Sequence, residues 1–368
     1  MKVLKVLLAV AAVLPMMSSC VSDGDYYAGF TNVDNNDRQP VYANTPLGYI
    51  AFASYGEWVM SQSSGKDWCT VQTMHGRGSA IYSIPVFYKL NTTGTARIAN
   101  FRLRDAKEGD DAYVDFYLSQ YATRGDGSLG NAALVSTITG DDGSSIEIAY
   151  DTLCRPVTLV MEKNGTELRK LSLSYERTDS TIRIKSGSSV LVSKYNTGFI
   201  PAGRLCSGTD TVGYYNQVTM GPEDIAFNVE EHKRGGEYTA QALLLVGQNL
   251  THPDVEHVAD SLKYQHRYAD GSKYTEMLKL AYSESSNRSQ SVDVNQLLLG
   301  VEECNPYTLL SLFPDARNSK IISEARAADG KFTVEAELNA DKSVSRLAVT
   351  GKQGTKVTYT FTYTSLPQ

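Results

Sequence analysis

The sequence predicts an all-β protein, in which an immunoglobulin-like β-sandwich is followed by a larger domain of antiparallel hairpins with a short helical insert. From about residue 48 onward, alternating apolar and polar runs are separated by turn residues about every eight to twelve positions. The dipeptides Asp142-Gly143, Asn164-Gly165 and Asp270-Gly271 stand between such runs and favour the positive φ of tight hairpin turns. The 29 glycines and 23 tyrosines are typical of turn-rich β structure.

Residues 1–19 have the composition of a secretion signal. Two lysines precede an apolar run from Val6 to Leu14, which is followed by small residues. The run is too short to span a bilayer, because a spanning helix takes about 20 residues. This order, ending at Cys20, resembles a bacterial lipobox, which implies cleavage before Cys20 and attachment to a membrane through lipid on its thiol. The alternative is a soluble secreted protein in which Cys20 forms a disulfide.

Residues 20–45 include the polar, turn-prone stretch NVDNNDRQP and predict a flexible, lipidated tether. Asp23 and Asp25 follow the cysteine closely and resemble the surface-export signal of Bacteroidetes lipoproteins. This resemblance implies an outer-membrane lipoprotein exposed at the cell surface, with a periplasm-facing position as the alternative.

The charge balance argues against nucleic acid as a partner. Removing the two lysines of residues 1–19 leaves 33 basic against 41 acidic residues, a net charge of −8. Phosphate neutralisation needs a basic surface, and no lysine-rich or arginine-rich stripe is present. Four further cysteines allow three pairings, and free or buried thiols are the default expectation: Cys69, Cys154, Cys206 and Cys304.

Residues 46–122 predict the β-sandwich. The expected strands are Ile50–Phe52, Glu57–Val59, Trp68–Val71, Ile81–Val86, Arg97–Leu103 and Tyr113–Leu118. The segments EWVM, DWCTV, HGRGS, IPV, LNTTGTAR and FYLSQ resemble the BACON domain, an immunoglobulin-like module of Bacteroidetes whose name abbreviates carbohydrate-binding and often N-terminal. The matching positions are Trp58, Trp68, Gly76, Asn91, Arg97 and Gln120.

The tryptophans Trp58 and Trp68 are the candidate glycan-binding residues. A sugar ring stacks its apolar face on an exposed aromatic ring, so either indole is suited to a glycan platform together with tyrosines. The alternative is that both fill the sandwich core, as tryptophan commonly does in this architecture.

Residues 123–131, TRGDGSLGN, predict a glycine-rich linker, and residues 132–368 predict the larger meander. In the meander, YDTLCRPVTLV resembles a YD-type hairpin, and the tyrosine-rich strands around Asp270-Gly271 repeat this pattern weakly. Leucine runs at 297–299 and 309–312 predict short helices. The combination of hairpins, the insert DVNQLL and the last strand VTYTFTY resembles a Bacteroidetes lipoprotein domain of unknown function, over about 140–365.

No motif for catalysis or cofactor binding is present, so we expect neither an enzyme nor a cofactor. His252, His257 and His266 match no metal-ligand spacing, and surface-loop positions are expected for them. Adjacent acidic pairs make poor acid–base couples, because neighbouring residues of a strand point to opposite faces. These pairs are Asp110-Asp111, Asp141-Asp142 and Glu230-Glu231.

These observations lead to one functional hypothesis and two alternatives. The leading hypothesis is a non-catalytic, lipid-anchored envelope protein that binds glycans or presents a binding domain to them. The first alternative is a structural or protein-interaction spacer without glycan binding. The weaker alternative is a glycan-active hydrolase, which would require two facing carboxylates in a cleft of the larger domain.

Overall fold

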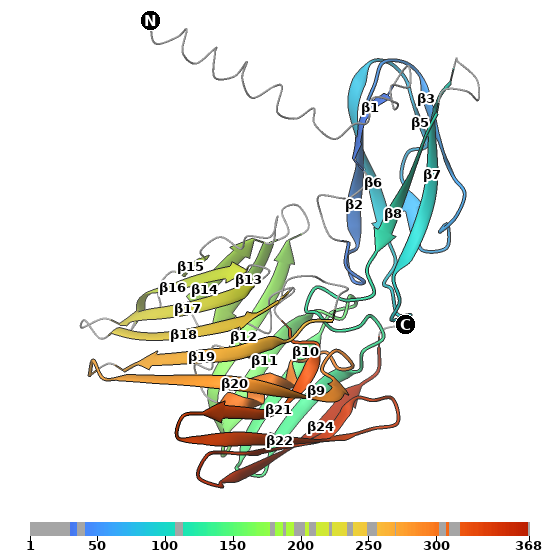
Figure 1. Cartoon of the computed structure of the whole chain (residues 1–368). Helices are drawn as coiled ribbons and strands as arrows, with labels where there is room; N and C mark the ends of the chain where they lie inside the picture. Colours follow the sequence, from blue (N-terminus) through green and yellow to red (C-terminus); the bar gives the residue numbers. More distant parts are fainter. Residues whose placement is uncertain are drawn as a thin grey trace, which may run out of the picture.

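The computed structural model describes residues 30–34, 41–106, 113–176, 181–186, 189–194, 203–205, 211–220, 223–233, 238–248, 256–268, 270–301, 307–308 and 317–366. Strands make up almost all of the regular structure, which confirms the predicted all-β class. They form a small sandwich and one large curled sheet (Figure 1). Among the described residues, no helix is long and apolar enough to cross a membrane.

The sandwich consists of two four-stranded antiparallel sheets, with strand orders β1-β2-β6-β4 and β5-β3-β7-β8. Apolar side chains from both sheets meet in one core, which includes Phe52, Trp58 and Leu103. The strands are β1 (Phe30–Asp34), β2 (Leu47–Ser54), β3 (Trp58–Gln62), β4 (Cys69–Val71), β5 (His75–Gly76), β6 (Ala80–Tyr88), β7 (Arg97–Asp105) and β8 (Tyr113–Gln120). The alternation in the sequence therefore located β2, β3, β4, β6, β7 and β8 to within a few residues, but it predicted neither β1 nor β5.

The sandwich begins earlier than residue 46, where the sequence placed its boundary. Strand β1 lies within the expected tether and pairs antiparallel with β2, with Phe30 opposite Ser54. Val41 and Ala43 are buried at the other end of the same unit. Fewer residues are therefore left for a tether behind Cys20 than the sequence indicated.

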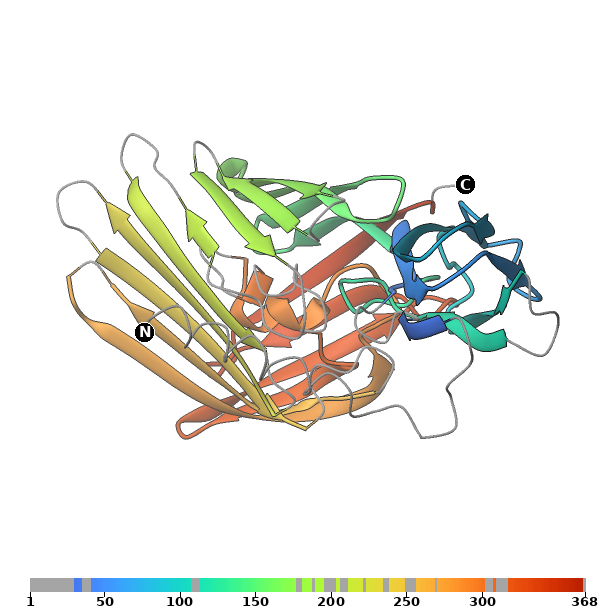
Figure 2. The ribbon, with the colours of Figure 1, turned by 90° about the horizontal axis from the view of Figure 1, so that it is seen from above.

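The large unit is a single antiparallel sheet of sixteen strands. Each strand pairs with the next along the chain, except that the chain passes from β14 to β15 without a ladder and the first strand, β9, pairs with the last, β24. The sheet curls until its two end strands, β14 and β15, lie next to each other (Figure 2). The strands are β9 (Leu134–Gly140), β10 (Ser144–Tyr150), β11 (Pro156–Lys163), β12 (Thr166–Glu176), β13 (Thr181–Ser186), β14 (Ser189–Lys194), β15 (Gly203–Leu205), β16 (Thr211–Met220), β17 (Asp224–Lys233), β18 (Tyr238–Gly247), β19 (Ala259–Arg267), β20 (Lys273–Ser286), β21 (Lys320–Ala327), β22 (Gly330–Leu338), β23 (Val344–Thr350) and β24 (Lys356–Thr364).

The hairpin turns form at the dipeptides that the sequence singles out. Asn164 and Gly165 have φ values of 50° and 76°, as a two-residue turn between β11 and β12 requires. Gly143 and Gly271 also have positive φ, at 82° and 83°. Glycine adopts this conformation without the steric cost that a Cβ would add.

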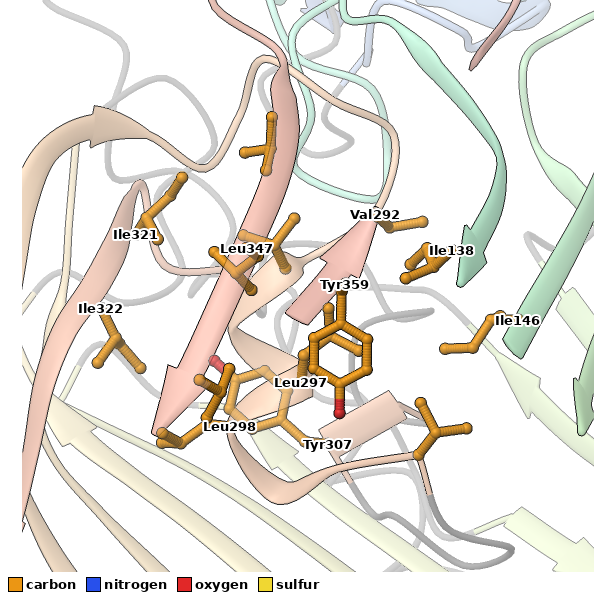
Figure 3. Packing of buried hydrophobic residues seen from close by; sticks show 14 of the residues in the cluster. Ile138, Ile146, Val292, Leu297, Leu298, Tyr307, Ile321, Ile322, Leu347 and Tyr359 are labelled. Atoms are coloured by element: carbon orange, nitrogen blue, oxygen red, sulfur yellow. The ribbon is translucent and has the colours of Figure 1, made fainter. Parts of the chain in front are cut away.

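A short 3₁₀ helix, η3 (Val294–Leu299), contributes Val294, Leu297 and Leu298 to the core of the curled sheet and corresponds to the expected helical insert. The buried Asp293 caps it, because its side chain accepts a hydrogen bond from the Asn295 amide. Leu297 and Leu298 lie among residues of the surrounding strands, including Ile138 and Tyr359 (Figure 3). The second expected helix, at 309–312, lies outside the described residues.

The glycine-rich segment 123–131 joins the two units and packs against both of them. Thr123 and Arg124 have no exposed surface. The Thr123 carbonyl accepts a hydrogen bond from Ala43 of the sandwich at 2.7 Å, and the Leu129 amide donates to Arg288 of the large unit at 2.8 Å. A Cβ added at Gly127 or Gly130 would lie 3.0 Å from Arg317 or 1.9 Å from the Asn91 carbonyl oxygen, so these two glycines allow the close packing.

Candidate functional site

The structure places both candidate tryptophans in the sandwich core. Trp58 is 1% exposed, and its ring centroid lies 4.9 Å from that of Phe52 and 5.1 Å from that of Tyr82. Trp68 is 6% exposed, and the Arg97 guanidinium lies 4.5 Å from its ring centroid. A glycan platform needs an exposed ring face, so the structure replaces that expectation for both residues with a packing role.

The remaining candidates from the sequence do not assemble into a catalytic or metal site in the part of the chain that the structure describes. No group of three or more metal-ligating side chains occurs among the described residues. Asp142 is bound to Lys163, and Asp141 accepts a hydrogen bond from the Thr358 amide. His257 is buried and His266 belongs to β19, so neither is the surface-loop residue expected. Cys20, Asp110-Asp111 and His252 lie outside the described residues.

An aromatic group on the β19–β20 hairpin is the strongest candidate for a binding site. We call it the hairpin aromatic cluster, and it consists of Tyr264, His266, Tyr268 and Tyr274. The rings of His266 and Tyr268 stack with centroids 4.0 Å apart and an interplanar angle of 21°. Tyr264 and Tyr274 meet edge to face at 6.2 Å. Tyr268 is 44% exposed and Tyr274 is 40% exposed, so both rings have surface available to a ligand.

The two-residue period of a strand brings these rings to one face. His266 lies opposite Tyr274 in the ladder, and Tyr264 lies opposite Glu276. The same rows continue into the buried Leu262 and Leu278. The cluster therefore lies where the core-facing rows of both strands pass beyond the core and become accessible to solvent.

A lysine and two carboxylates border the cluster, and we call this group the acid–lysine network. Lys352 Nζ lies 2.6 Å from Glu276 Oε2 and 3.0 Å from both carboxylate oxygens of Asp329. The Tyr274 hydroxyl donates to the same Glu276 oxygen. The network joins two hairpin turns, because Asp329 lies between β21 and β22, and Lys352 lies between β23 and β24.

The contacts of the network shift the pKa values of Lys352, Asp329 and the adjoining Tyr274. Hydrogen bonds to Glu276 and Asp329 raise the pKa of Lys352 above its usual value. The hydrogen bond from Lys352 lowers the pKa of Asp329. Burial, together with the hydrogen bond to Glu276, raises the pKa of Tyr274 to about 12. At neutral pH the lysine is therefore charged, Asp329 is a carboxylate and Tyr274 is a neutral hydrogen-bond donor.

The arrangement combines apolar ring faces with fixed hydrogen-bond acceptors. Exposed tyrosine faces accept the CH side of a sugar ring, while carboxylate oxygens accept hydrogen bonds from hydroxyl groups. Sequence reasoning recognised tyrosine-rich strands here but did not identify the site. The sequence did contain one signal for the site, the aromatic residues at every second position, Tyr264, His266 and Tyr268. The contact between Lys352 and Glu276 depends on the fold and has no such local signal.

No protein-family model matches the chain. No curated protein matches it either. Among solved structures it is similar to a porin-like protein from Bacteroides vulgatus, with 12% identity and a TM-score of 0.43, over 64% of this chain and 100% of that chain. A porin-like protein from Bacteroides uniformis matches with 10% identity and a TM-score of 0.41, over 62% of this chain and 98% of that chain.

A Bacteroides ovatus GH5 xyloglucanase in complex with a XXXG heptasaccharide matches over 27% of this chain and 21% of that chain, with 21% identity and a TM-score of 0.20. At these identities and TM-scores, none of the three assigns a family or a function to the chain.

Proposed function

We propose that this protein is a non-catalytic, lipid-anchored envelope protein that binds glycans through the hairpin aromatic cluster. The observation that carries the proposal is the pair of accessible rings, Tyr268 and Tyr274, beside fixed carboxylates. Aromatic faces with a few convergent polar groups are the usual elements of a sugar-binding surface. The lipobox-like order of residues ending at Cys20 supports the anchoring.

The electrostatics of the network support a binding role rather than hydrolysis. A glycosidase needs one carboxylic acid that remains protonated and donates its proton to the leaving group. The pKa of Asp329 is lowered by Lys352, which is the opposite change. Glu276 is held by the same ammonium group and by the Tyr274 hydroxyl.

Affinity electrophoresis tests the proposal. Residues 21–368 migrate through gels that contain host or plant polysaccharides, beside the variants Tyr268→Ala and Tyr274→Ala. Burial of roughly 60 Å² of ring surface at about 25 cal/mol per Å² contributes about 1.5 kcal/mol, so each variant is expected to bind about tenfold more weakly. The matched control is Tyr117→Ala, which removes a ring of similar exposure, 49%, from the sandwich.

The control variant should be retarded as strongly as the unchanged protein, and circular dichroism should show that all variants are folded. Equal retardation of the Tyr268→Ala and Tyr274→Ala variants and the unchanged protein would exclude the cluster as the site. Migration unaffected by every polysaccharide would favour the spacer alternative instead. The buried tryptophans and the packed segment 123–131 are the observations that favour a spacer.

A further inference from the structure

The two most exposed large apolar side chains in the described part of the chain lie at one end of the sandwich. Ile81 is 86% exposed and Tyr55 is 65% exposed. Ile81 pairs with Ala53, while Tyr55 directly follows Ser54, the last residue of β2. We call residues 54–57 and 77–81 the sandwich tip.

The chain enters the sandwich at this tip. Phe30, the first residue of β1, lies opposite Ser54 in the ladder. Phe30 lies ten positions after Cys20, and a fully extended chain of that length spans at most about 35 Å. The large unit adjoins the other end of the sandwich (Figure 1). A lipid on Cys20 would therefore keep the tip, and not the large unit, close to the bilayer.

The chemistry of the tip fits the interface of a bilayer. The strands β2, β4 and β6 contain no Asp, Glu, Lys, Arg or His, and in β1, which completes their sheet, Asp34 is the one such residue. Glu57 and Arg77 carry opposite charges at the tip itself. The Glu57 carbonyl accepts a hydrogen bond from the Ala106 amide, and Lys107, Glu108, Asp110 and Asp111 follow Ala106 in the sequence. The Tyr82 hydroxyl donates to the carbonyls of Arg77 and Gly78 at 2.8 and 3.0 Å, which fixes the loop before Ile81.

We propose that the sandwich tip inserts Tyr55 and Ile81 into the headgroup region of the leaflet that holds the Cys20 lipid. This inference rests on the anchoring part of the proposed function. Isoleucine contributes apolar area, and tyrosine places its ring and hydroxyl at the boundary between acyl chains and water. The contact holds the sandwich upright on the membrane and directs the large unit away from the bilayer.

Vesicle flotation of the chain without its lipid isolates this contact. Residues 21–368 are mixed with phosphatidylethanolamine–phosphatidylglycerol vesicles at millimolar lipid, beside a Tyr55→Ser, Ile81→Ser double variant. We expect the double variant to partition at least about tenfold more weakly, since two apolar side chains no longer insert. The control is Ile98→Ser, because Ile98 is 55% exposed but pairs with Ser119 near the opposite end of the sandwich.

The control should float as the unchanged protein does, and 0.5 M salt should leave flotation intact, because insertion of apolar groups is not screened. Absence of flotation, equal flotation of the double variant, or loss of flotation in salt would each overturn the proposal. Failure of the anchor itself is measured separately, by the mass of the full chain from a lipoprotein-processing host. Glycan binding is read from the polysaccharide gels, so the three results are independent.

Discussion

Replacing Trp58 with alanine distinguishes a core tryptophan from a glycan platform. The indole is 1% exposed and packs against Phe52 and Tyr82. An alanine built at Gly76 would place its Cβ 2.4 Å from the indole Nε1, so the ring fills its space completely. If the packing role is correct, the variant loses stability; if the platform role were correct, it would lose only binding.

The expected loss is large. Truncation of a buried aromatic side chain to alanine costs about 3–5 kcal/mol, because both transfer energy and packing contacts disappear. For a sandwich of this size, with an m value of about 1 kcal/mol/M in urea, the midpoint should fall by at least about 3 M. Trp58→Phe keeps most of the packing. It also removes a buried indole N–H that has no acceptor among the described residues, so it should cost less than about 2 kcal/mol.

Tryptophan fluorescence during urea unfolding is the assay, because both tryptophans belong to the sandwich and report on that unit alone. In the alanine variant, Trp68 remains as the reporter. A midpoint within about 0.5 M of that of the unchanged protein would refute the packing role. A folded variant that no longer binds a polysaccharide would restore the platform interpretation.

Three further predictions concern buried and paired groups. Arg124→Ala should lower the free energy of unfolding by about 3 kcal/mol in calorimetry, because two buried carbonyls lose the guanidinium that donates to them. Burial opposes ionisation of Asp142, but hydrogen bonds from Lys163 and Ser144 outweigh it and lower its pKa. The stabilisation by ionised Asp142 is therefore present above pH ~4 and is lost as the pH falls. In urea titrations, the free energy of unfolding of the unchanged protein should exceed that of Asp142→Asn by about 1 kcal/mol at pH 7, and this difference should approach zero near pH ~2. Burial raises the pKa of Cys69 to about 12, so in a chain whose other cysteines are serine this thiol should react with an aromatic disulfide reagent at pH 8 only after denaturation.

The strands were predictable because their signal is local. Alternation and turn dipeptides depend on residues within a few positions of each other, and these located β2 to β4 and the turn at Asn164-Gly165. The segment 123–131 was not predictable in the same way. Its composition is that of a loop, and its burial depends on partners as distant as Ala43 and Arg288.

In the candidate site, too, local features were visible in the sequence and long-range contacts were not. The row Tyr264, His266 and Tyr268 is visible in the sequence as alternate positions of one strand. Lys352 joins Glu276 from a turn 76 residues later, and only the order of strands in the sheet brings the two together. A tryptophan in a sandwich strand commonly either fills the core or offers its ring to a ligand. The sequence alone did not distinguish these two roles, because the pattern of residues does not give the exposed fraction of a ring.

The ladder between β9 and β24 makes the end of the chain the closing piece of the large sheet. The hydroxyls of Ser136 and Thr362 lie 3.0 Å apart, although 226 positions separate them in the sequence. During synthesis from the N-terminus, β9 emerges long before its partner, and such distant contacts make folding slow. Until β24 arrives, β9 and β23 each present an open edge to which another chain can add a strand. Loss of the last ten residues would make this exposure permanent and would add two long open edges to a sheet whose only other edges among the described strands, β14 and β15, lie next to each other, which favours aggregation.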